Sequence, residues 1–396
     1  MALLPRRRPI LAARQSGGLI ARAVRTRLER LEHGVLHVLA DGERYTFGKP
    51  VGEGPTLEAE IEIVDPAFWS SVATRGSVGA GESYIRGHWR TDDLAALMRL
   101  FARNHDALEE VESGLARISR PLFAARHALR RNTQSGSRKN IQAHYDLSND
   151  FFELILDPTL TYSAGVFERD DSTLHEAQLA KLDRLCRLLQ LQASDHLLEI
   201  GTGWGALAMY AAENFGCKVT TTTISEQQYA YATKRIREAG LEDRIEVLLS
   251  DYRLLEGQFD KIVSVEMIEA VGHRYYGTYF EKCASLLKPN GLFAMQAITI
   301  ADRHYERARR AVDFIQRYIF PGSCIPSISA LTSAASRKSD LTLVSLGDIT
   351  EGYVRTLRAW DDNLHANEKS IKALGFDDEF IRLWEFYLAY CEGGFA

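Results

Sequence analysis

The stretch HLLEIGTGWGALAMYAA, from His196 to Ala212, decides the fold. Apolar and β-favouring residues run into an acid, a glycine-rich turn follows, and an Ala/Leu/Met/Tyr pattern typical of a helix begins at once. Gly201 and Gly203 can adopt positive φ and leave no Cβ between the backbone and a ligand. A strand, a tight loop and a helix start in this order are typical of a nucleotide-binding α/β sheet. A glycine turn without a ligand is the alternative, and the elements that follow argue against it.

Four further strands are predicted downstream of this loop, at 218–224, 244–250, 261–267 and 292–299. Ser225 and Gln228 have the spacing of a capping box and start one intervening helix, and 275–287 forms another. Strands that alternate with helices predict right-handed βαβ units and a doubly wound parallel sheet. Ligands of such sheets bind at the carboxyl ends of the strands, so the residues that follow each strand are the candidate site.

The composition is ordinary for a globular protein, with 396 residues of which 45% are hydrophobic and 26% charged. This length suffices for two domains, and no apolar run approaches the ~20 residues that a membrane-spanning helix requires. We also expect no signal peptide, because the start MALLPRRRPI has no apolar core after its arginines. Five scattered cysteines without CxxC pairs predict reduced, mostly buried thiols in a cytoplasmic protein, and no metal site.

A polar, turn-rich segment at 132–137 predicts a domain boundary. We expect a small α+β N-terminal domain at 1–130 and a larger α/β domain at 140–396. The predicted elements of the smaller domain are three strands and a helix, at 34–40, 44–47, 58–63 and 92–103.

The N-terminus is strongly basic although the net charge of the chain is −5. Between residues 6 and 30 there are eight arginines and one acid, and apolar residues recur there at helical spacing. These apolar residues are Leu19, Ile20, Val24, Leu28 and Leu31. A basic amphipathic helix can lie on an anionic membrane surface, or it can pack on its own domain with its arginines in solvent, and both interpretations stay open. Nucleic acid is not an expected partner, because no recognised motif or interleaved aromatic platform accompanies the charge.

Seven islands of sequence stand out, from the glycine loop to both ends of the larger domain. They are IQAHYDLSNDFFELILDPTLTYSAGVF (141–167), EIGTGWGALA, TTTISEQQ, SDYRLL, VEMIEAVGHRYY (265–276), YIFPGSCIPS (318–327) and YVRTLRAW (353–360). Together they resemble cyclopropane-fatty-acyl-phospholipid synthases and the similar mycolic acid cyclopropane synthases. The N-terminal GSVGAGESYIRGHWRTDDL resembles the small lipid-binding domain of the bacterial phospholipid enzymes. The resemblance implies the doubly wound sheet of a class I S-adenosylmethionine-dependent methyltransferase, with inserted helices.

The resemblance also implies a reaction. S-adenosylmethionine would deliver a methyl carbon to the cis double bond of an unsaturated phospholipid acyl chain, and the product would be a cyclopropane. An alkene is a poor nucleophile, so the sulfonium methyl must be held in line at close range. Methyl transfer leaves a carbocation, and a base must take a proton from the added methyl so that the ring closes. In the family a bound bicarbonate ion is this base.

Five residues are assigned to the bicarbonate pocket by the resemblance. Glu269 matches the acid that orients the anion, Tyr353 matches the tyrosine of that site, and Ile298 matches the residue whose backbone contributes. Ala164 stands where the family's usual YSC has cysteine, and Gln296 stands where its common LHTI has histidine. Gln296 can donate a hydrogen bond to an anion but cannot take a proton near neutral pH. Ala164 offers only its backbone N–H.

Glu266 competes with Glu269 for the role of the functional acid, because it lies directly at the predicted strand end. The family motif favours Glu269, which precedes the Val-Gly-His turn. His144 and His273 are expected to be hydrogen-bonding framework residues.

The resemblance assigns a second set of residues to S-adenosylmethionine. They are Tyr162, Ser163, Gly201, Gly203, Thr223, Gln228, Asp251 and Tyr252. Thr223 and Gln228 match polar residues near the ribose, and Asp251 and Tyr252 follow the third strand, where adenine usually lies. The alternatives are that Thr223 only ends a strand and that Tyr252 only packs.

The C-terminus raises one further expectation. Family members usually continue with a seventh, antiparallel strand that inserts between strands five and six. Without that strand, the expected sixth strand at 341–346 would have unpaired backbone groups, which are costly when buried. Either the sequence is a shortened form, or another segment or chain fills the gap.

Two rival functions stay open. The carbocation could become a methyl-branched, methylene or hydroxylated chain, a question that Ala164 and Gln296 raise. The protein could instead be a lipid-binding protein that has lost catalysis, although Glu269, Tyr353 and the glycine loop argue against this. We expect an enzyme that associates with an anionic membrane surface at the inner face of the membrane, and a homodimer stays open.

Overall fold

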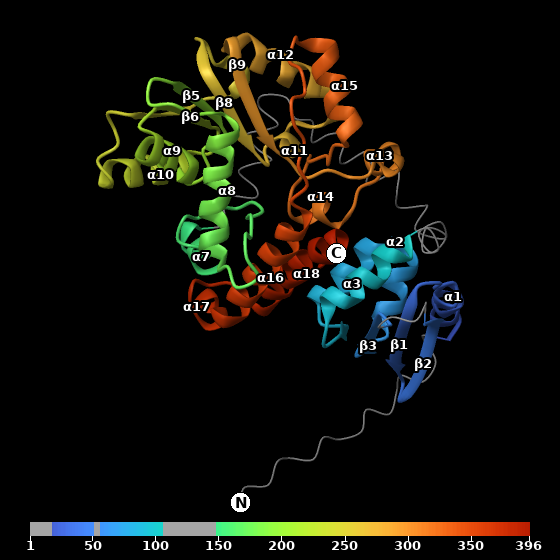
Figure 1. Cartoon of the computed structure of the whole chain (residues 1–396). Coiled ribbons are helices and arrows are strands. Elements are labelled where there is room, and N and C mark those ends of the chain that lie inside the picture. The colour runs from blue at the N-terminus through green and yellow to red at the C-terminus, as the bar shows by residue number, and fades with distance from the viewer. Residues whose placement is uncertain (1–17, 51–55, 106–147) are drawn as a thin grey trace, which may run out of the picture. The chain divides into compact units, whose positions relative to one another are not determined.

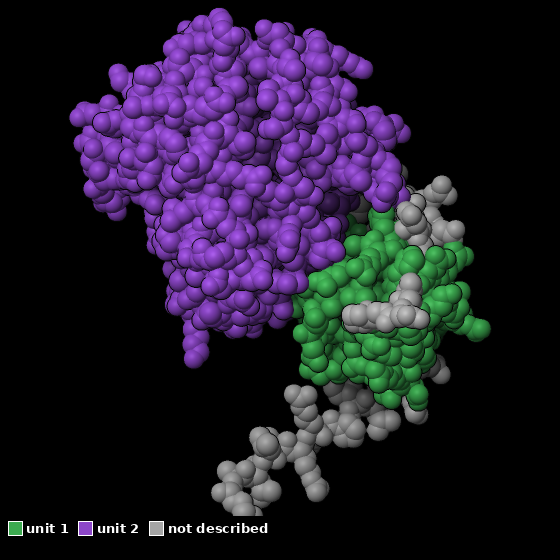
Figure 2. All heavy atoms as spheres, in the orientation of Figure 1, with its two compact units in different colours: residues 1–119 green, residues 120–396 purple. Residues whose placement is uncertain are grey.

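The computed structural model describes residues 18–50, 56–105 and 148–396 (Figure 1). Contacts between residues divide the chain into two compact units, at 1–119 and 120–396 (Figure 2). The predicted boundary at 132–137, His144 and the arginines at positions 6–8 lie outside the described residues.

The first unit contains a four-stranded sheet in the order β2-β1-β3-β4. Its strands and helices are α1 (Gly18–Leu28), β1 (Gly34–Ala40), β2 (Glu43–Lys49), β3 (Glu58–Ile63), α2 (Ala67–Ile85), β4 (Trp89–Arg90) and α3 (Leu94–Arg103). A tight turn joins β1 to β2, and both Asp41 and Gly42 have positive φ there, as the two-residue turns of β-hairpins require. The predicted strands at 34–40 and 58–63 are confirmed, and the predicted strand at 44–47 is longer by one residue at its start and two at its end.

Helix α1 packs against its own unit through one face. Val24, Leu28 and the following Leu31 are buried, whereas Leu19 is 86% exposed and Ile20 is 40% exposed. Most of the apolar stripe is therefore engaged within the first unit, and only the first turn of α1 presents apolar side chains to solvent.

The second unit is built on a parallel sheet in the order β7-β6-β5-β8-β9. Its strands are β5 (His196–Ile200), β6 (Lys218–Thr223), β7 (Ile245–Leu249), β8 (Phe259–Val265) and β9 (Leu287–Gln296). The longer helices around the sheet are α8 (Leu174–Leu188), α9 (Ala206–Phe215), α10 (Glu226–Glu238), α12 (Tyr276–Leu286) and α15 (Ile328–Lys338). The predicted doubly wound class I methyltransferase fold is confirmed.

Neighbouring residues of β5 lie in different hydrophobic layers because side chains alternate along a strand. Leu197 packs with residues of α8, α9 and α10. Leu198 packs with residues of α12 and α15. Figure 1 shows these two groups of helices on opposite sides of the sheet. The parallel strands are therefore buried on both faces, as their near-continuous apolar sequences predict.

Shorter elements and a helical layer complete the second unit. The short elements are a 3-10 turn at Tyr252–Leu254, α11 (Ile268–Val271), a 3-10 turn at His273–Tyr275, α13 (Asp302–Ala308) and α14 (Phe314–Tyr318). The helical layer consists of α7 (Asn149–Ile155), α16 (Thr350–Ala366), α17 (Glu368–Ala373) and α18 (Asp378–Phe395). Aromatic rings join this layer, with Phe151 and Trp384 in edge contact at 4.7 Å between their centroids.

Two predictions about the strands after β8 are wrong. The fifth strand, β9, runs from Leu287 to Gln296 and not from 292 to 299: Asn290 has positive φ inside it and the register with β8 shifts there. Residues 341–346, the expected sixth strand, form no strand, and Val344 is 84% exposed. Among the described strands β9 pairs with β8 alone, so no strand lies beyond β9 against which this segment could form a ladder.

Candidate active site

The glycine loop lies at the carboxyl end of β5. Gly201 has φ 107° and Gly203 has φ 52°, which a glycine adopts without strain. The backbone N–H groups of Gly201 and Thr202 both donate to the carbonyl of Thr222 at 3.0 Å, which fixes the loop against β6. A Cβ on Gly203 would have no atom within 4 Å. The loop therefore presents bare backbone to open space, as a ligand needs.

The other predicted cofactor residues on this side follow β6 and β7. The hydroxyl of Thr223 donates to Oε1 of Gln228 at 2.9 Å, and both residues are buried. Asp251 accepts from the guanidinium of Arg253 at 2.8 Å and 2.6 Å. The ring of Tyr252 lies edge-on to Tyr279 with their centroids 5.3 Å apart, so Tyr252 contributes to packing. Since β5, β6 and β7 are adjacent and parallel, these residues share one edge of the sheet with the glycine loop.

Tyr162 and Ser163 lie between α7 and α8 and are held from α8. The amide of Gln178 donates to the carbonyl of Ser163 at 2.9 Å, and Nζ of Lys181 donates to the Ser163 hydroxyl at 2.7 Å. The hydroxyls of Tyr162 and Tyr387 lie 2.8 Å apart. This segment is thus tied to the sheet side by α8 and to the helical layer by α18.

The carboxylate of Glu266 follows β8 and collects three of the five residues predicted for the anion pocket. Oε1 of Glu266 accepts from the backbone N–H of Ala164 at 2.9 Å and from the amide of Gln296 at 2.9 Å. Oε2 of Glu266 accepts from the hydroxyl of Tyr353 at 2.9 Å. Three segments that are distant in sequence therefore converge on Glu266, the acid that the family motif ranked second to Glu269.

Glu269, on α11, occupies a different position. Its Oε1 accepts from the backbone N–H of Ile298 at 2.5 Å, and its buried Oε2 has no hydrogen-bond partner. Burial, together with the negative charge of Glu266, raises the pKa of Glu269 to about 8. The predicted set is therefore divided: Ala164, Gln296 and Tyr353 contact Glu266, whereas Ile298 contacts Glu269.

Lys181 is a site residue that sequence reasoning missed. Burial lowers the pKa of its amine to about 7, while the charges of Glu266 and Asp157 oppose this shift. A signal for it exists in the sequence, because Gln178 and Lys181 fall on the apolar face of α8, beside Ala177 and Leu182. Polar residues on the buried face of an amphipathic helix need partners, and here both of them hold Ser163.

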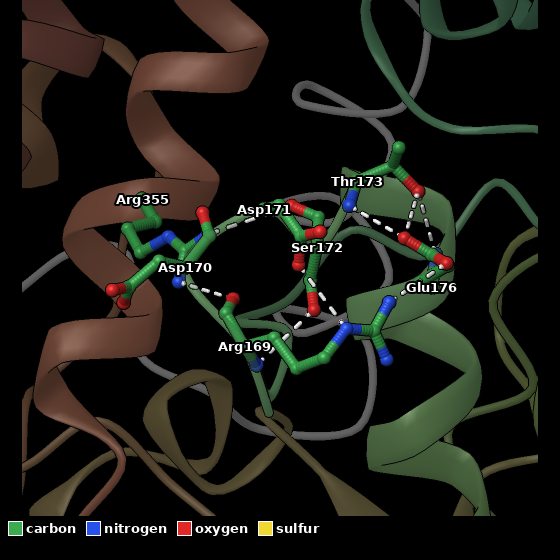
Figure 3. Close-up of polar contacts among 7 residues, drawn as sticks. All are labelled: Arg169, Asp170, Asp171, Ser172, Thr173, Glu176 and Arg355. Atoms are coloured by element: carbon green, nitrogen blue, oxygen red, sulfur yellow. Dashed lines mark hydrogen bonds and ion pairs between the residues drawn. The ribbon is translucent and has the colours of Figure 1, made fainter.

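Contacts outside the pocket fix α8 against α16, the helix that carries Tyr353. Figure 3 shows the capping box of α8, in which Glu176 accepts from the backbone of Thr173 at 2.8 Å. In the same view Arg355 of α16 donates to the carbonyls of Arg169 and Asp170, at 3.0 Å and 2.8 Å. These bonds tie the segment before α8 to α16, the helix that carries Tyr353.

The described part of the chain contains neither a metal-ligand cluster nor a candidate membrane span. No group of three His, Cys, Asp or Glu side chains there is arranged to hold a metal ion. No helix in that part is long and apolar enough to cross a membrane.

Comparison with known proteins connects this geometry to chemistry. The family model described as mycolic acid cyclopropane synthetase matches residues 132–396. Over 359 residues the chain is 38% identical to tuberculostearic acid methyltransferase UfaA1 of Mycobacterium tuberculosis, an alignment that covers 89% of this chain and 83% of the relative. It is 36% identical over 340 residues to cyclopropane-fatty-acyl-phospholipid synthase of Escherichia coli K12, covering 85% of this chain and 84% of that enzyme.

A solved structure shows the same fold with a cofactor product bound. It is mycolic acid cyclopropane synthase CmaA1 complexed with SAH and CTAB, which is 34% identical with a TM-score of 0.58. The match covers 65% of this chain and 91% of that one.

Proposed function

The chain belongs to the mycolic acid cyclopropane synthetase family of S-adenosylmethionine-dependent methyltransferases, and on that premise we propose that it modifies the cis double bond of unsaturated phospholipid acyl chains. The observation that supports this most directly is the convergence on Glu266, at the same sheet edge as the glycine loop. A carboxylate held by three donors beside a methyl-donor site suits a reaction that builds up positive charge on an apolar substrate.

S-adenosylmethionine fits the residues at the ends of β5 and β6. Gly201 and Gly203 offer bare backbone, and the paired Thr223 and Gln228 offer polar atoms next to the loop. The cofactor supplies an electrophilic methyl group on a sulfonium. Tyr162 and Ser163, held by α8 and α18, would close the site from the helical side.

Aromatic side chains suit the carbocation that methyl transfer leaves on the acyl chain. The ring of Tyr162 lies 5.1 Å from that of Trp360 and 6.2 Å from that of Phe320, measured between centroids. Ring faces attract cations and exclude water, so they would keep the carbocation from capture as an alcohol. Loss of a proton from the added methyl then closes a cyclopropane ring, which is the product we propose.

A second candidate product is a methylene or methyl-branched chain. Ala164 and Gln296 bring neither a thiol nor an imidazole to the pocket, and a relative at 38% identity is named tuberculostearic acid methyltransferase. A hydride shift within the acyl chain, before proton loss from the same methyl, would give the methylene chain. A saturated branch needs a hydride donor in addition.

We further propose that the first unit binds membranes peripherally. The first turn of α1 exposes Leu19 and Ile20, and the nearby Arg22 is exposed as well. Exposed apolar side chains beside a cation favour an anionic bilayer surface.

The test is to incubate the purified protein with trideuteromethyl S-adenosylmethionine and vesicles of monounsaturated phospholipid. We expect lipid that retains two of the three deuterons, because one is lost with the proton. NMR separates ring methylene signals from those of an alkene, and thus decides between the two products. If no deuterium from the methyl group is found in the lipid, the proposed substrate is wrong.

A further inference from the structure

The geometry points to Glu266 as the built-in base of this site, a protein carboxylate that takes the place of the bicarbonate ion. This inference rests on the proposed function for the reaction, whereas its statement about the anion pocket is independent of the lipid substrate.

Bicarbonate does not fit the pocket as an additional group. The donors expected to hold it are the N–H of Ala164, the amide of Gln296 and the hydroxyl of Tyr353, and all three already bind Glu266. The N–H of Ile298 is likewise bound to Glu269. A planar carboxylate in the same ring of donors satisfies them as a bicarbonate would, and a further anion would be buried beside two acids without donors of its own.

The backbone of Glu266 provides a second observation. Its φ is 45°, in the left-handed region that favours glycine. A non-glycine residue there is strained and persists only where its surroundings hold it, which is typical of functional positions. The N–H of Glu266 donates to the carbonyl of Gln296 at 2.8 Å, and this bond fixes the turn that directs the carboxylate into the ring of donors.

The surroundings of Glu266 suit a base. Burial raises the pKa of Glu266, although the bonds from Ala164 and Gln296 and the charge of Lys181 oppose this shift, and a raised pKa makes a carboxylate a stronger base. Oε1 accepts two hydrogen bonds and Oε2 only one, so Oε2 has a lone pair to spare.

The proposed step is a proton transfer from carbon to Glu266. Oε2 of Glu266 takes a proton from the methyl carbon that has been added to the acyl chain. The electron pair of the broken C–H bond forms the last carbon–carbon bond of the ring and neutralises the carbocation. Glu266 becomes a neutral acid, with Tyr353 still hydrogen-bonded to the carboxyl group, and it returns the proton to water before the next turnover.

Two variants test the inference. Glu266→Gln keeps the shape of the side chain and removes the base, so turnover should fall about 10²–10⁴-fold while S-adenosylmethionine affinity by calorimetry stays within twofold. Glu266→Gly relaxes the backbone and leaves the three donors empty, so bicarbonate or formate should restore part of its turnover. Glu392→Gln is the matched control, because Glu392 is a buried carboxylate that is bound to Arg358 of the helical layer at 2.6 Å and not to the donors around Glu266. It should keep wild-type turnover.

A binding measurement decides the inference without relying on activity. Carbon-13 NMR of labelled bicarbonate should show no binding to the wild-type protein and binding to Glu266→Gly. Bicarbonate bound by the wild type, turnover lost in carbonate-free buffer, or a fully active Glu266→Gln would each overturn the inference. If the wild type modifies no lipid at all, the proposed function fails, and the NMR comparison still decides whether Glu266 fills the anion pocket.

Discussion

The candidate site has two halves, one at the carboxyl ends of β5 and β6 and one at those of β8 and β9, and the two halves are built differently. The first half is local: the loop bonds to Thr222 of the next strand, and Thr223 pairs with Gln228 five residues away. The second half is assembled from a distance: Glu266 meets Ala164 across 102 positions and Tyr353 across 87. The first half is formed by backbone geometry, whereas the second is formed by hydrogen bonds between distant side chains. Substitutions should therefore affect the two halves in different ways.

The largest effect in the local half is expected at Gly203. Gly203→Val would place a branched side chain in the open space beside the loop, and S-adenosylmethionine affinity should fall at least 100-fold. Gly240→Val is the control, because Gly240 also has positive φ and open space but lies after α10. Both variants have similar backbone strain, about 1–3 kcal/mol. Equal cofactor affinity in the two variants would show that the loop does not hold the ligand.

Stability as a function of pH compares the two halves directly. Burial raises the pKa of Glu199 in β5 to about 8, and burial with the charge of Glu266 does the same for Glu269. A carboxyl with a raised folded-state pKa contributes stability that is complete below its unfolded pKa and is lost as the pH rises through the folded one. Between pH 5 and pH 8 the free energy of unfolding of the wild type should therefore fall by about 3 kcal/mol more than that of Glu269→Gln.

Urea unfolding at both pH values measures this difference. Glu199→Gln should flatten the pH dependence in the same way, since Thr221 can still donate at 2.6 Å to its side-chain oxygen. Curves that run parallel to those of the wild type would mean that neither carboxyl is protonated in the folded state near pH 7.

Tyr353→Phe probes the convergent half with a smaller expected effect. Loss of the hydroxyl leaves Oε2 of Glu266 without its partner, and turnover should fall about tenfold, with unchanged cofactor affinity. Tyr387→Phe is matched to it, because that hydroxyl bonds to the hydroxyl of Tyr162 and not to Glu266. A larger loss in Tyr387→Phe would shift the functional role to the helical layer.

The smallest effect is expected outside both halves. Arg22→Ala should weaken binding to anionic vesicles about fivefold at low salt, because one cation near such a surface is worth about 1 kcal/mol. The effect should fade as salt rises. Arg103→Ala, on an exposed position of α3 in the same unit, changes the net charge equally and should have less effect. Equal losses would indicate attraction by net charge rather than by α1.

The fold was largely predictable because its signals are local. Neighbouring residues alone predicted β5, the glycine loop, the cap at Ser225 and the alternation of strands and helices. It failed at 341–346, where an apolar pattern favoured a strand but the structure has no adjacent strand to pair with. A strand is stabilised by its neighbours, so a pattern alone cannot guarantee one.

The candidate site was predictable only in part, for the same physical reason. The family resemblance assigned Ala164, Gln296 and Tyr353 to one pocket, and it ranked Glu269 above Glu266. The sequence by itself determined which side chains could carry charge and where the backbone could bend, since these are properties of single residues and short spacings. Only the tertiary structure decided that Glu266 receives the donors and that Lys181 is buried beside it, because hydrogen bonds and desolvation depend on which distant segments meet.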